Sequence, residues 1–279
     1  MSWLWGGVVF WLVAWGANVV LARRAPPRVA RIAVPVLFGV AVLVLWEGIV
    51  RGTGVSVVIL PAPTVIAATF AANTGLLWGD FMQTIVKGAL SGYAIGCSAA
   101  ILVALAIDRS PFLARGLLPV GNFVAALPIV GVAPIMVTWF GFGWESKAAV
   151  VSAMVFFPVL VNAVAGLAAA ERMQRDLMHT WSATWWQTLR HLRLPAAMPF
   201  IFNGLRISTT LALIGAIVAE FFGSPTRGMG FRISTAVGSL ALPMVWAQIV
   251  VAALAGTTFF GIVTLIERRV TFWHPSQRR

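Results

Sequence analysis

Long apolar runs alternate with short polar segments along the chain. Each run reaches roughly 20 residues, the length that an α-helix needs to cross about 30 Å of hydrocarbon. The pattern predicts an all-α polytopic membrane protein. We expect seven membrane-spanning helices, at residues 2–22, 31–50, 84–107, 117–140, 147–169, 200–222 and 239–266.

Two of the intervening segments are longer than a simple turn. The stretch 51–83 contains ILPAPTVIAATF, in which Pro61 and Pro63 favour an extended backbone ahead of a short helix in the membrane interface. The stretch 170–199 is the longest polar block, and its second half reads WSATWWQTLRHLRLPAAMP.

This block has the periodicity of an amphipathic helix outside the hydrocarbon. Its apolar face is formed by Trp181, Trp185, Leu189 and Leu192. Pro195 is expected to end the helix, and Pro199 to open the next span, because proline opposes helix continuation but suits a first turn. The helix could lie among lipid headgroups or dock a soluble partner, and periodicity alone favours neither.

Composition and charge fit a membrane protein and indicate its orientation. Of the 279 residues, 60% are hydrophobic and 10% charged, with a net charge of +12. The basic residues lie in short groups between apolar runs, which argues against a nucleic-acid partner. With the N-terminus outside, fifteen of the twenty basic residues face the cytoplasm, starting with Arg23, Arg24, Arg28 and Arg31, and the C-terminus is cytoplasmic.

The first apolar run has no basic segment before it and is followed by RRAPPRVAR. A cleaved signal peptide shows the reverse charge order, so residues 2–22 are interpreted as a retained helix. The single Cys97 lies within an apolar run and is expected to be a packing residue.

The segment RDLMHTWSATWWQTLRHLRLPAAMPFIFNGLRIS resembles the cytoplasmic coupling motif of permeases of binding-protein-dependent ABC importers. That motif runs from an acidic residue through a Gly-Ala pair to a basic helix, then Leu-Pro-x-Ala-x-Pro and a Gly in the next span. The matching residues are Asp176, Ala183, Trp186, Gln187, Leu194, Pro195, Ala197, Pro199 and Gly204. The chain departs from the motif at Ser182, where Gly would permit a turn with positive φ, and at Leu177 and Met178, where small residues are usual.

Other stretches resemble the branch of these permeases that handles nitrate, sulfonates, taurine and pyrimidine-type vitamin precursors. They are ILPAPTVI, ALPIVGVAPIMVTWFGFGWESK, FFPVLVNAVAGL and GAIVAEFFGSPTRGMGF. The resemblance covers roughly residues 40–266 and omits the first helix. It implies a six-helix permease core plus one extra N-terminal helix, divided as 1–30 (extra helix and basic loop), 31–266 (permease domain with coupling loop 170–199) and 267–279 (basic cytoplasmic tail).

The resemblance also implies a function and partners. The chain would be the permease of an ATP-driven importer in the inner membrane, working by alternating access with two ATPase subunits, an extracytoplasmic solute-binding protein, a second permease copy and membrane lipid. The residues implied to couple the permease to the ATPase are Asp176, Ser182, Ala183, Trp185, Trp186, Gln187, Leu189, Arg190, Leu194, Pro195, Pro199 and Gly204.

The sequence offers no chemistry of its own for ATP hydrolysis. A phosphate-binding loop of the form G-x-x-x-x-G-K-[ST] is missing, since the lysines Lys87 and Lys147 follow Val86 and Ser146. His179, His191 and His274 lack ligand-like spacing to cysteine or carboxylates. We therefore expect no enzyme activity, no cofactor and no metal, with hydrolysis on a separate polypeptide.

Polar and helix-breaking residues within the spans are candidates for lining a translocation path, because such groups in hydrocarbon usually face protein or a water-filled cavity. For most of the neutral polar residues a structural role is favoured, because single Ser and Thr side chains commonly bond back to their own helix. For Glu220 and the prolines, packing and path lining are equally open, and for Glu47 an interfacial role is favoured. The path candidates are Asn122, Pro128, Pro134, Asn162, Ser208, Thr209, Thr210 and Glu220. The stretch GSPTRGMGF at 223–231 is either a contact for the binding protein or a solvated turn.

Two alternatives come from other classes. A self-contained secondary transporter would need more intramembrane charges than Glu47 and Glu220, and related halves. A membrane-anchored sensor would use the 176–194 loop as a lipid anchor, but the sequence has no evident output domain. The transported solute stays open among sulfonates, nitrate and pyrimidine-like compounds.

Overall fold

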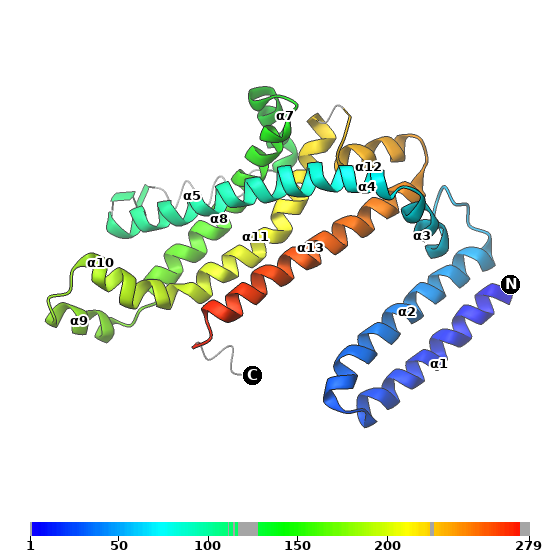
Figure 1. Cartoon of the computed structure of the whole chain (residues 1–279), viewed down its shortest axis with the longest axis horizontal. Helices are drawn as coiled ribbons and strands as arrows, with labels where there is room; N and C mark the ends of the chain where they lie inside the picture. The colour runs from blue at the N-terminus through cyan, green and yellow to red at the C-terminus, as the bar shows by residue number, and fades with distance from the viewer. Residues whose placement is uncertain (1, 111, 114, 117–127, 224–225, 274–279) are drawn as a thin grey trace. The chain divides into compact units, whose positions relative to one another are not determined.

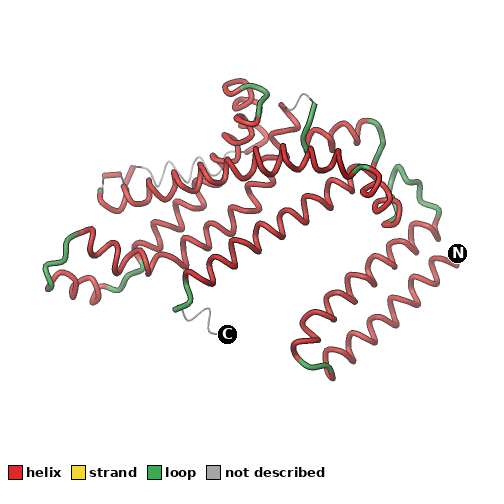
Figure 2. The backbone as a smooth tube through the Cα atoms, viewed as in Figure 1, coloured by secondary structure: helices red, strands yellow, loops and turns green. Residues whose placement is uncertain are grey.

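The computed structural model describes residues 2–110, 112–113, 115–116, 128–223 and 226–273. Every regular element in these ranges is helical (Figures 1 and 2). The elements are α1 (Ser2–Arg24), α2 (Pro27–Thr53), α3 (Pro63–Ala72), α4 (Thr74–Phe81), η1 (Met82–Leu90), α5 (Ser91–Arg109), α7 (Ile129–Phe140), α8 (Trp144–Ala168), α9 (Arg172–Thr180), α10 (Trp185–Thr188), η2 (Leu189–Arg193), α11 (Leu194–Gly223), α12 (Met229–Gly238) and α13 (Leu242–Val270).

Six continuous helices within the described ranges are long and apolar enough to cross a membrane. They are Ser2–Arg24, Pro27–Thr53, Thr74–Arg109, Trp144–Ala168, Trp185–Gly223 and Leu242–Val270. The expected all-α polytopic membrane fold is thus confirmed. The seventh expected span, 117–140, lies partly outside the described residues, and its remainder forms the shorter helix α7.

The short helix expected after Pro63 is α3, which has proline in its first turn. Glu47 of α2 accepts hydrogen bonds from the backbone N–H of Thr64 (3.0 Å) and from its hydroxyl (2.7 Å), and it pairs with Arg51. Glu47 therefore holds the first turn of α3 against α2 by pairing one backbone N–H that the helix start leaves without a partner, together with the Thr64 hydroxyl.

The chain forms two compact units. The first contains residues up to Leu77 together with Ile233–Ile249, and includes the antiparallel hairpin of α1 and α2. The second contains Trp78–Arg232 and the chain from Val250, and it holds the principal hydrophobic core.

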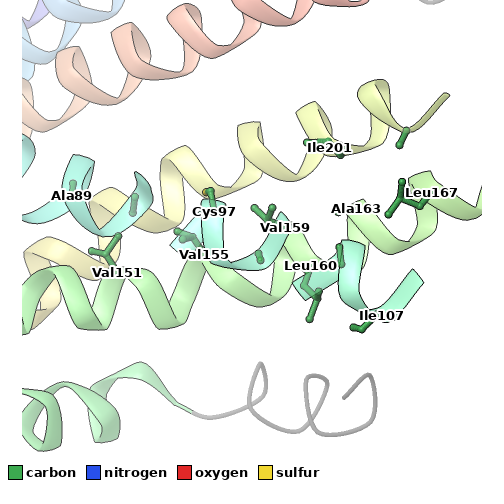
Figure 3. Packing of buried hydrophobic residues seen from close by; sticks show 14 of the residues in the cluster. Ala89, Cys97, Ile107, Val151, Val155, Val159, Leu160, Ala163, Leu167 and Ile201 are labelled. Carbon is green, nitrogen blue, oxygen red and sulfur yellow. The ribbon is translucent and has the colours of Figure 1, made fainter. Parts of the chain in front are cut away.

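In the second unit, α8 packs between α5 and α11. Figure 3 shows Val151, Val155 and Val159 of α8 in the same cluster as Cys97 of α5, which is buried as the sequence predicts. Glycines bring the backbones together, and this matters because apolar side chains gain little by leaving lipid for protein. A Cβ on Gly96 would lie 2.5 Å from Cγ2 of Val155.

We predict that Gly96→Val lowers the free energy of unfolding by about 2 kcal/mol or more, since the added atoms overpack the α5 and α8 contact. Gly79→Val is the control, because a Cβ there meets no atom within 4 Å. Thermal unfolding of the purified protein in detergent measures both. Equal melting temperatures for the two variants would contradict the close packing.

Candidate functional site

The segment 170–193 forms the short helix α9 and the first turns of a longer helix, α10 and η2, at the end of the α8 and α11 pair (Figure 1). The first, α9, is strongly amphipathic. Its apolar side chains Met173 and Leu177 are exposed, as is Trp181, which follows the helix at the same four-residue spacing. Asp176 is also exposed, and its Oδ2 lies 4.0 Å from Nε of Arg172. This edge of the segment is therefore accessible on the surface of the chain.

A tight turn separates α9 from the next helix. Ser182 adopts φ 55°, the left-handed conformation that a Gly in the motif would provide. The N–H of Ser182 bonds to the carbonyl of His179 (2.9 Å), and the N–H of Ala183 bonds to that of Met178 (3.0 Å). A left-handed turn therefore occurs at this position although serine occupies it, at a conformational cost of about 1–2 kcal/mol.

The second helix begins with a reciprocal cap. The hydroxyl of Thr184 accepts from the N–H of Gln187, and the side chain of Gln187 accepts from the N–H of Thr184 (2.7 Å). Thr184 and Gln187 thereby satisfy donors that the helix start leaves unpaired. The spacing T-x-x-Q is the sequence signature of this cap, and it identifies Thr184 as a residue that the family motif does not include.

The expected apolar stripe through Trp181, Trp185, Leu189 and Leu192 is wrong as a single face. The chain reverses at Ser182, so Trp181 lies outside the helix that carries the other three. Leu189 is only 1% exposed and packs in the main core, whereas Trp186 is 66% exposed. Trp185 is half-buried, with its ring 5.2 Å from the guanidinium carbon of Arg109. The helix that begins at Trp185 is therefore packed on the core through Trp185 and Leu189, and it exposes Trp186.

The expected helix end at Pro195 is also wrong, because the helix continues from Trp185 to Gly223. Residues 189–193 form a π-helical turn, in which the N–H of Leu194 bonds to the carbonyl of Leu189, five residues back. Pro195 then falls in the first turn of α11, and Pro199 lies inside it. A wider turn ahead of Pro195 relieves the clash that proline makes in a regular α-helix.

Arg193 fixes this helix to two others, which sequence reasoning missed. Its guanidinium donates to both carboxylate oxygens of Asp108 at the end of α5, with one distance of 2.8 Å, and to the carbonyl of Leu167 in α8 (3.0 and 3.1 Å). Both side chains are largely buried. Because the planar guanidinium of Arg193 bonds to a carboxylate and a carbonyl in fixed directions, it fixes the orientation of the helix, which a lysine ammonium would not.

The remaining coupling candidates lie on the helix that carries Arg193. Arg190 is exposed beside Trp186, and Leu194 is partly buried against the main core. Gly204 lets α11 approach α8, since a Cβ there would lie 3.2 Å from Cα of Val159. The structure thus separates an exposed group (Asp176, Trp186 and Arg190) from a packed group (Leu189, Leu194 and Gly204).

A buried polar network lies at the other end of α11. Glu220, 2% exposed, accepts from the hydroxyl of Thr84 (2.8 and 2.9 Å) and from the N–H of Gly230 (2.8 Å). Thr84 in turn accepts from the N–H of Met229 (2.7 Å), and Asp80 from the N–H of Gly228 (2.9 Å). These side chains cap the start of α12, so Glu220 has a packing role in this structure.

Among the other path candidates, Ser208 and Thr209 are buried, while Thr210 is exposed on α11. Asn162 of α8 accepts from Asn203 of α11 (3.0 Å), and Asn203 is exposed. Pro128 precedes α7 and Pro134 lies within it. Asn122 lies outside the described residues. No group of three metal-ligating side chains occurs in the part of the chain that the structure describes.

Comparison with known proteins gives consistent matches. Residues 92–272 match the family model described as binding-protein-dependent transport system inner membrane component. The chain is 32% identical over 236 residues to the riboflavin transport system permease protein RibX of Chloroflexus aurantiacus, covering 84% of this chain and 87% of that protein. It is 30% identical over 244 residues to the formylaminopyrimidine transport permease protein ThiX of Halalkalibacterium halodurans (87% and 96%). It is 29% identical over 240 residues to the taurine transport system permease protein TauC of Escherichia coli (83% and 86%).

We predict that Ser182→Val opens the turn between α9 and α10, because a β-branched residue tolerates positive φ poorly. Trypsin should then cleave the purified protein after Arg172 and Arg175 several-fold faster, and Ser182→Gly should slow cleavage slightly. Thr180→Val, at an exposed helical position, is the control. Similar cleavage rates for Ser182→Val and Thr180→Val would contradict the need for a left-handed residue.

Proposed function

Because this chain belongs to the family of inner membrane components of binding-protein-dependent transport systems, and is thus the permease subunit of an ABC importer, we propose that its loop 170–199 receives the ATPase subunit. Such permeases do not hydrolyse ATP themselves, and the family implies an ATPase and a binding protein as partners. The chain is a multi-pass inner membrane protein.

The observation that carries the docking proposal is an exposed apolar edge on a firmly held loop. The side chains that form this edge are 51–76% exposed: Met173, Leu177, Trp181 and Trp186. The loop that bears them is polar in composition. Tryptophan beside arginine is the usual composition of an interface hot spot. Trp186, Arg190 and Asp176 would contact the ATPase, with Ala183 and Ser182 setting the angle between the two helices.

The packed group would transmit the movement of the ATPase. Leu189 and Leu194 lie against the core, and Arg193 is bonded to the ends of α5 and α8, so a shift of α10 also moves those ends. Pro195, Pro199 and Gly204 belong to the same continuous helix, which would carry the movement into the membrane. Trp185 and Gln187 keep the start of that helix in place.

Two permease copies and two ATPase subunits would form the complete translocation unit. One exposed face of α11 supports this, because it carries the polar side chains Asn203 and Thr210 beside Ile207 and Ile214. Polar groups at membrane depth usually face protein or water rather than lipid. We propose that this face and Asn162 lie toward the path, together with Pro128, Pro134 and Asn122. Ser208, Thr209 and Glu220 would support it from behind.

The charge distribution supports an orientation with the C-terminus in the cytoplasm and the N-terminus outside. In that orientation loop 170–199 faces the ATPase, and residues 226–231 face the extracytoplasmic binding protein. We propose 31–266 as the permease domain, 1–30 as an added helix with its basic loop, and 267–279 as a cytoplasmic tail.

The solute is proposed to be small and polar. The related permeases are named for riboflavin, formylaminopyrimidine and taurine, and another from Bacillus subtilis for aliphatic sulfonates. A sulfonate, taurine, nitrate or a pyrimidine-type vitamin precursor fits this range. Binding measurements on the partner solute-binding protein would identify it.

We predict that Trp186→Ala reduces co-elution of the ATPase subunit with the permease tenfold or more, as expected for the loss of an interface anchor. Trp139→Ala is the matched control, since Trp139 is 71% exposed but lies on α7. Affinity purification of the complex from its host measures both. Unchanged co-elution of the Trp186 variant would contradict the docking proposal.

We predict that Arg193→Lys leaves ATPase binding intact but lowers solute transported per ATP hydrolysed several-fold, because lysine keeps the charge and loses the fork to Asp108 and Leu167. Asp108→Asn should have the same effect. Arg175→Lys, on the exposed surface of α9, should behave as wild type. Transport and ATPase assays in reconstituted vesicles give the ratio, and a wild-type ratio for Arg193→Lys would refute transmission through this residue.

A further inference from the structure

The hairpin of α1 and α2 is closely packed at one end and open at the other. The two helices run antiparallel and are joined by a short turn at residues 25–26 (Figure 1). Near the N-terminus their backbones touch, since a Cβ on Gly48 would lie 2.8 Å from the carbonyl oxygen of Trp3, and one on Gly52 would lie 2.5 Å from Cβ of Leu4. No comparable glycine contact occurs beside the turn in the described hairpin.

Toward the turn the helices enclose an apolar crevice of about 510 Å³. Its walls are aromatic and aliphatic except for one carboxamide, and the lining residues are Trp11, Trp15, Asn18, Val19, Ala22, Val34, Pro35, Phe38 and Ala41. Trp11 and Phe38 contact each other at the closed end, with ring centroids 5.6 Å apart. From Trp11 to Ala22 the crevice runs about 16 Å at the rise of an α-helix, which is close to the depth of hydrocarbon in one leaflet.

Four arginines surround the open end of this crevice. Arg23 and Arg24 directly follow Ala22, and Arg28 and Arg31 precede Val34. All four side chains are exposed, and none forms an ion pair with a carboxylate in the described part of the chain. A concentrated positive charge without internal compensation therefore adjoins an apolar slot of one leaflet's depth.

From this arrangement we propose that the hairpin of α1 and α2 is a binding site for an anionic phospholipid. The lipid phosphate binds the four arginines, and one acyl chain lies in the crevice between Trp15, Val19 and Phe38. Guanidinium groups match phosphate oxygens geometrically, and basic pockets between membrane helices are a recurring recognition site for anionic headgroups. The site is independent of the proposed transport activity, because it lies wholly within the first unit.

Asn18 gives the site a third point of recognition. Its Oδ1 is buried and has no hydrogen-bond partner, although the residue lines the crevice. Asn18 lies five residues before Arg23, about 7.5 Å along the helix axis, at the depth where a phospholipid bound to the arginines carries its ester carbonyls. The carboxamide can present its NH₂ instead of its oxygen by rotation, and the NH₂ would donate to such a carbonyl.

Native mass spectrometry of the full chain in detergent tests the proposal, with phosphatidylglycerol and phosphatidylcholine of identical acyl chains as probes. We expect the wild-type protein to retain phosphatidylglycerol at least tenfold better than phosphatidylcholine. Replacing Arg23, Arg24, Arg28 and Arg31 by Gln should remove this preference. The charge-matched control replaces Arg172, Arg175, Arg268 and Arg269, all exposed, by Gln and should keep it.

A second pair of variants keeps all four arginines, and so avoids any change of membrane orientation. Ala22→Trp fills the crevice and should reduce retention of phosphatidylglycerol about tenfold. Val20→Trp, exposed on the same helix but not part of the lining, should not.

Four results would overturn the proposal. If the wild-type protein retained the two lipids equally, the crevice would bind acyl chains without selecting the headgroup. If the charge-matched control lost the preference for phosphatidylglycerol equally, net charge alone would explain the binding. If Ala22→Trp retained phosphatidylglycerol as well as the wild-type protein does, the crevice would not be part of the binding site. Displacement of phosphatidylglycerol by millimolar inorganic phosphate, with no effect of Ala22→Trp, would indicate a site for free anions.

Discussion

The close approach of α8 to both α5 and α11 is the contact on which the rest of the second unit depends. Gly92 and Gly96 on α5, and Gly204 and Gly215 on α11, leave no space for a side chain at these crossings. Between helices in lipid, such contact replaces the hydrophobic effect as the main source of stability. Once the three backbones are this close, the ends of α8 and the loops that follow them can occupy only a narrow range of positions.

Polar groups reinforce the two ends of this helix triplet in different ways. At one end Arg193 joins the helix before α11 to α5 and α8 through a single guanidinium. At the other, Glu220 and Thr84 accept from consecutive backbone N–H groups and so hold the start of α12. The middle is apolar and close-packed. At both ends the charged side chains are held by several hydrogen bonds each, to side chains and to backbone groups.

Sequence patterns predicted the spanning helices well because apolar length is a strong and local signal. They do not decide the turn at Ser182, because serine stands where the motif has Gly, and the left-handed conformation there is seen only in the structure. They failed for the apolar stripe, because the periodicity of one helix was applied across a reversal of the chain. The pairing of Arg193 with Asp108 spans 85 residues, and the network around Glu220 joins helices far apart in sequence, so neither leaves a local pattern to detect.

The π-helical turn at residues 189–193 sets the rotational phase of the chain. A π turn contains one residue more than an α turn, and one residue corresponds to about 100° of rotation around the helix axis. The direction in which Trp186 points, relative to the face of α11 that packs on α8, is thus fixed by residue count within a continuous helix. The orientation of Trp186 is therefore set by the same helix that enters the membrane, whereas that of Trp181 depends on the turn at Ser182.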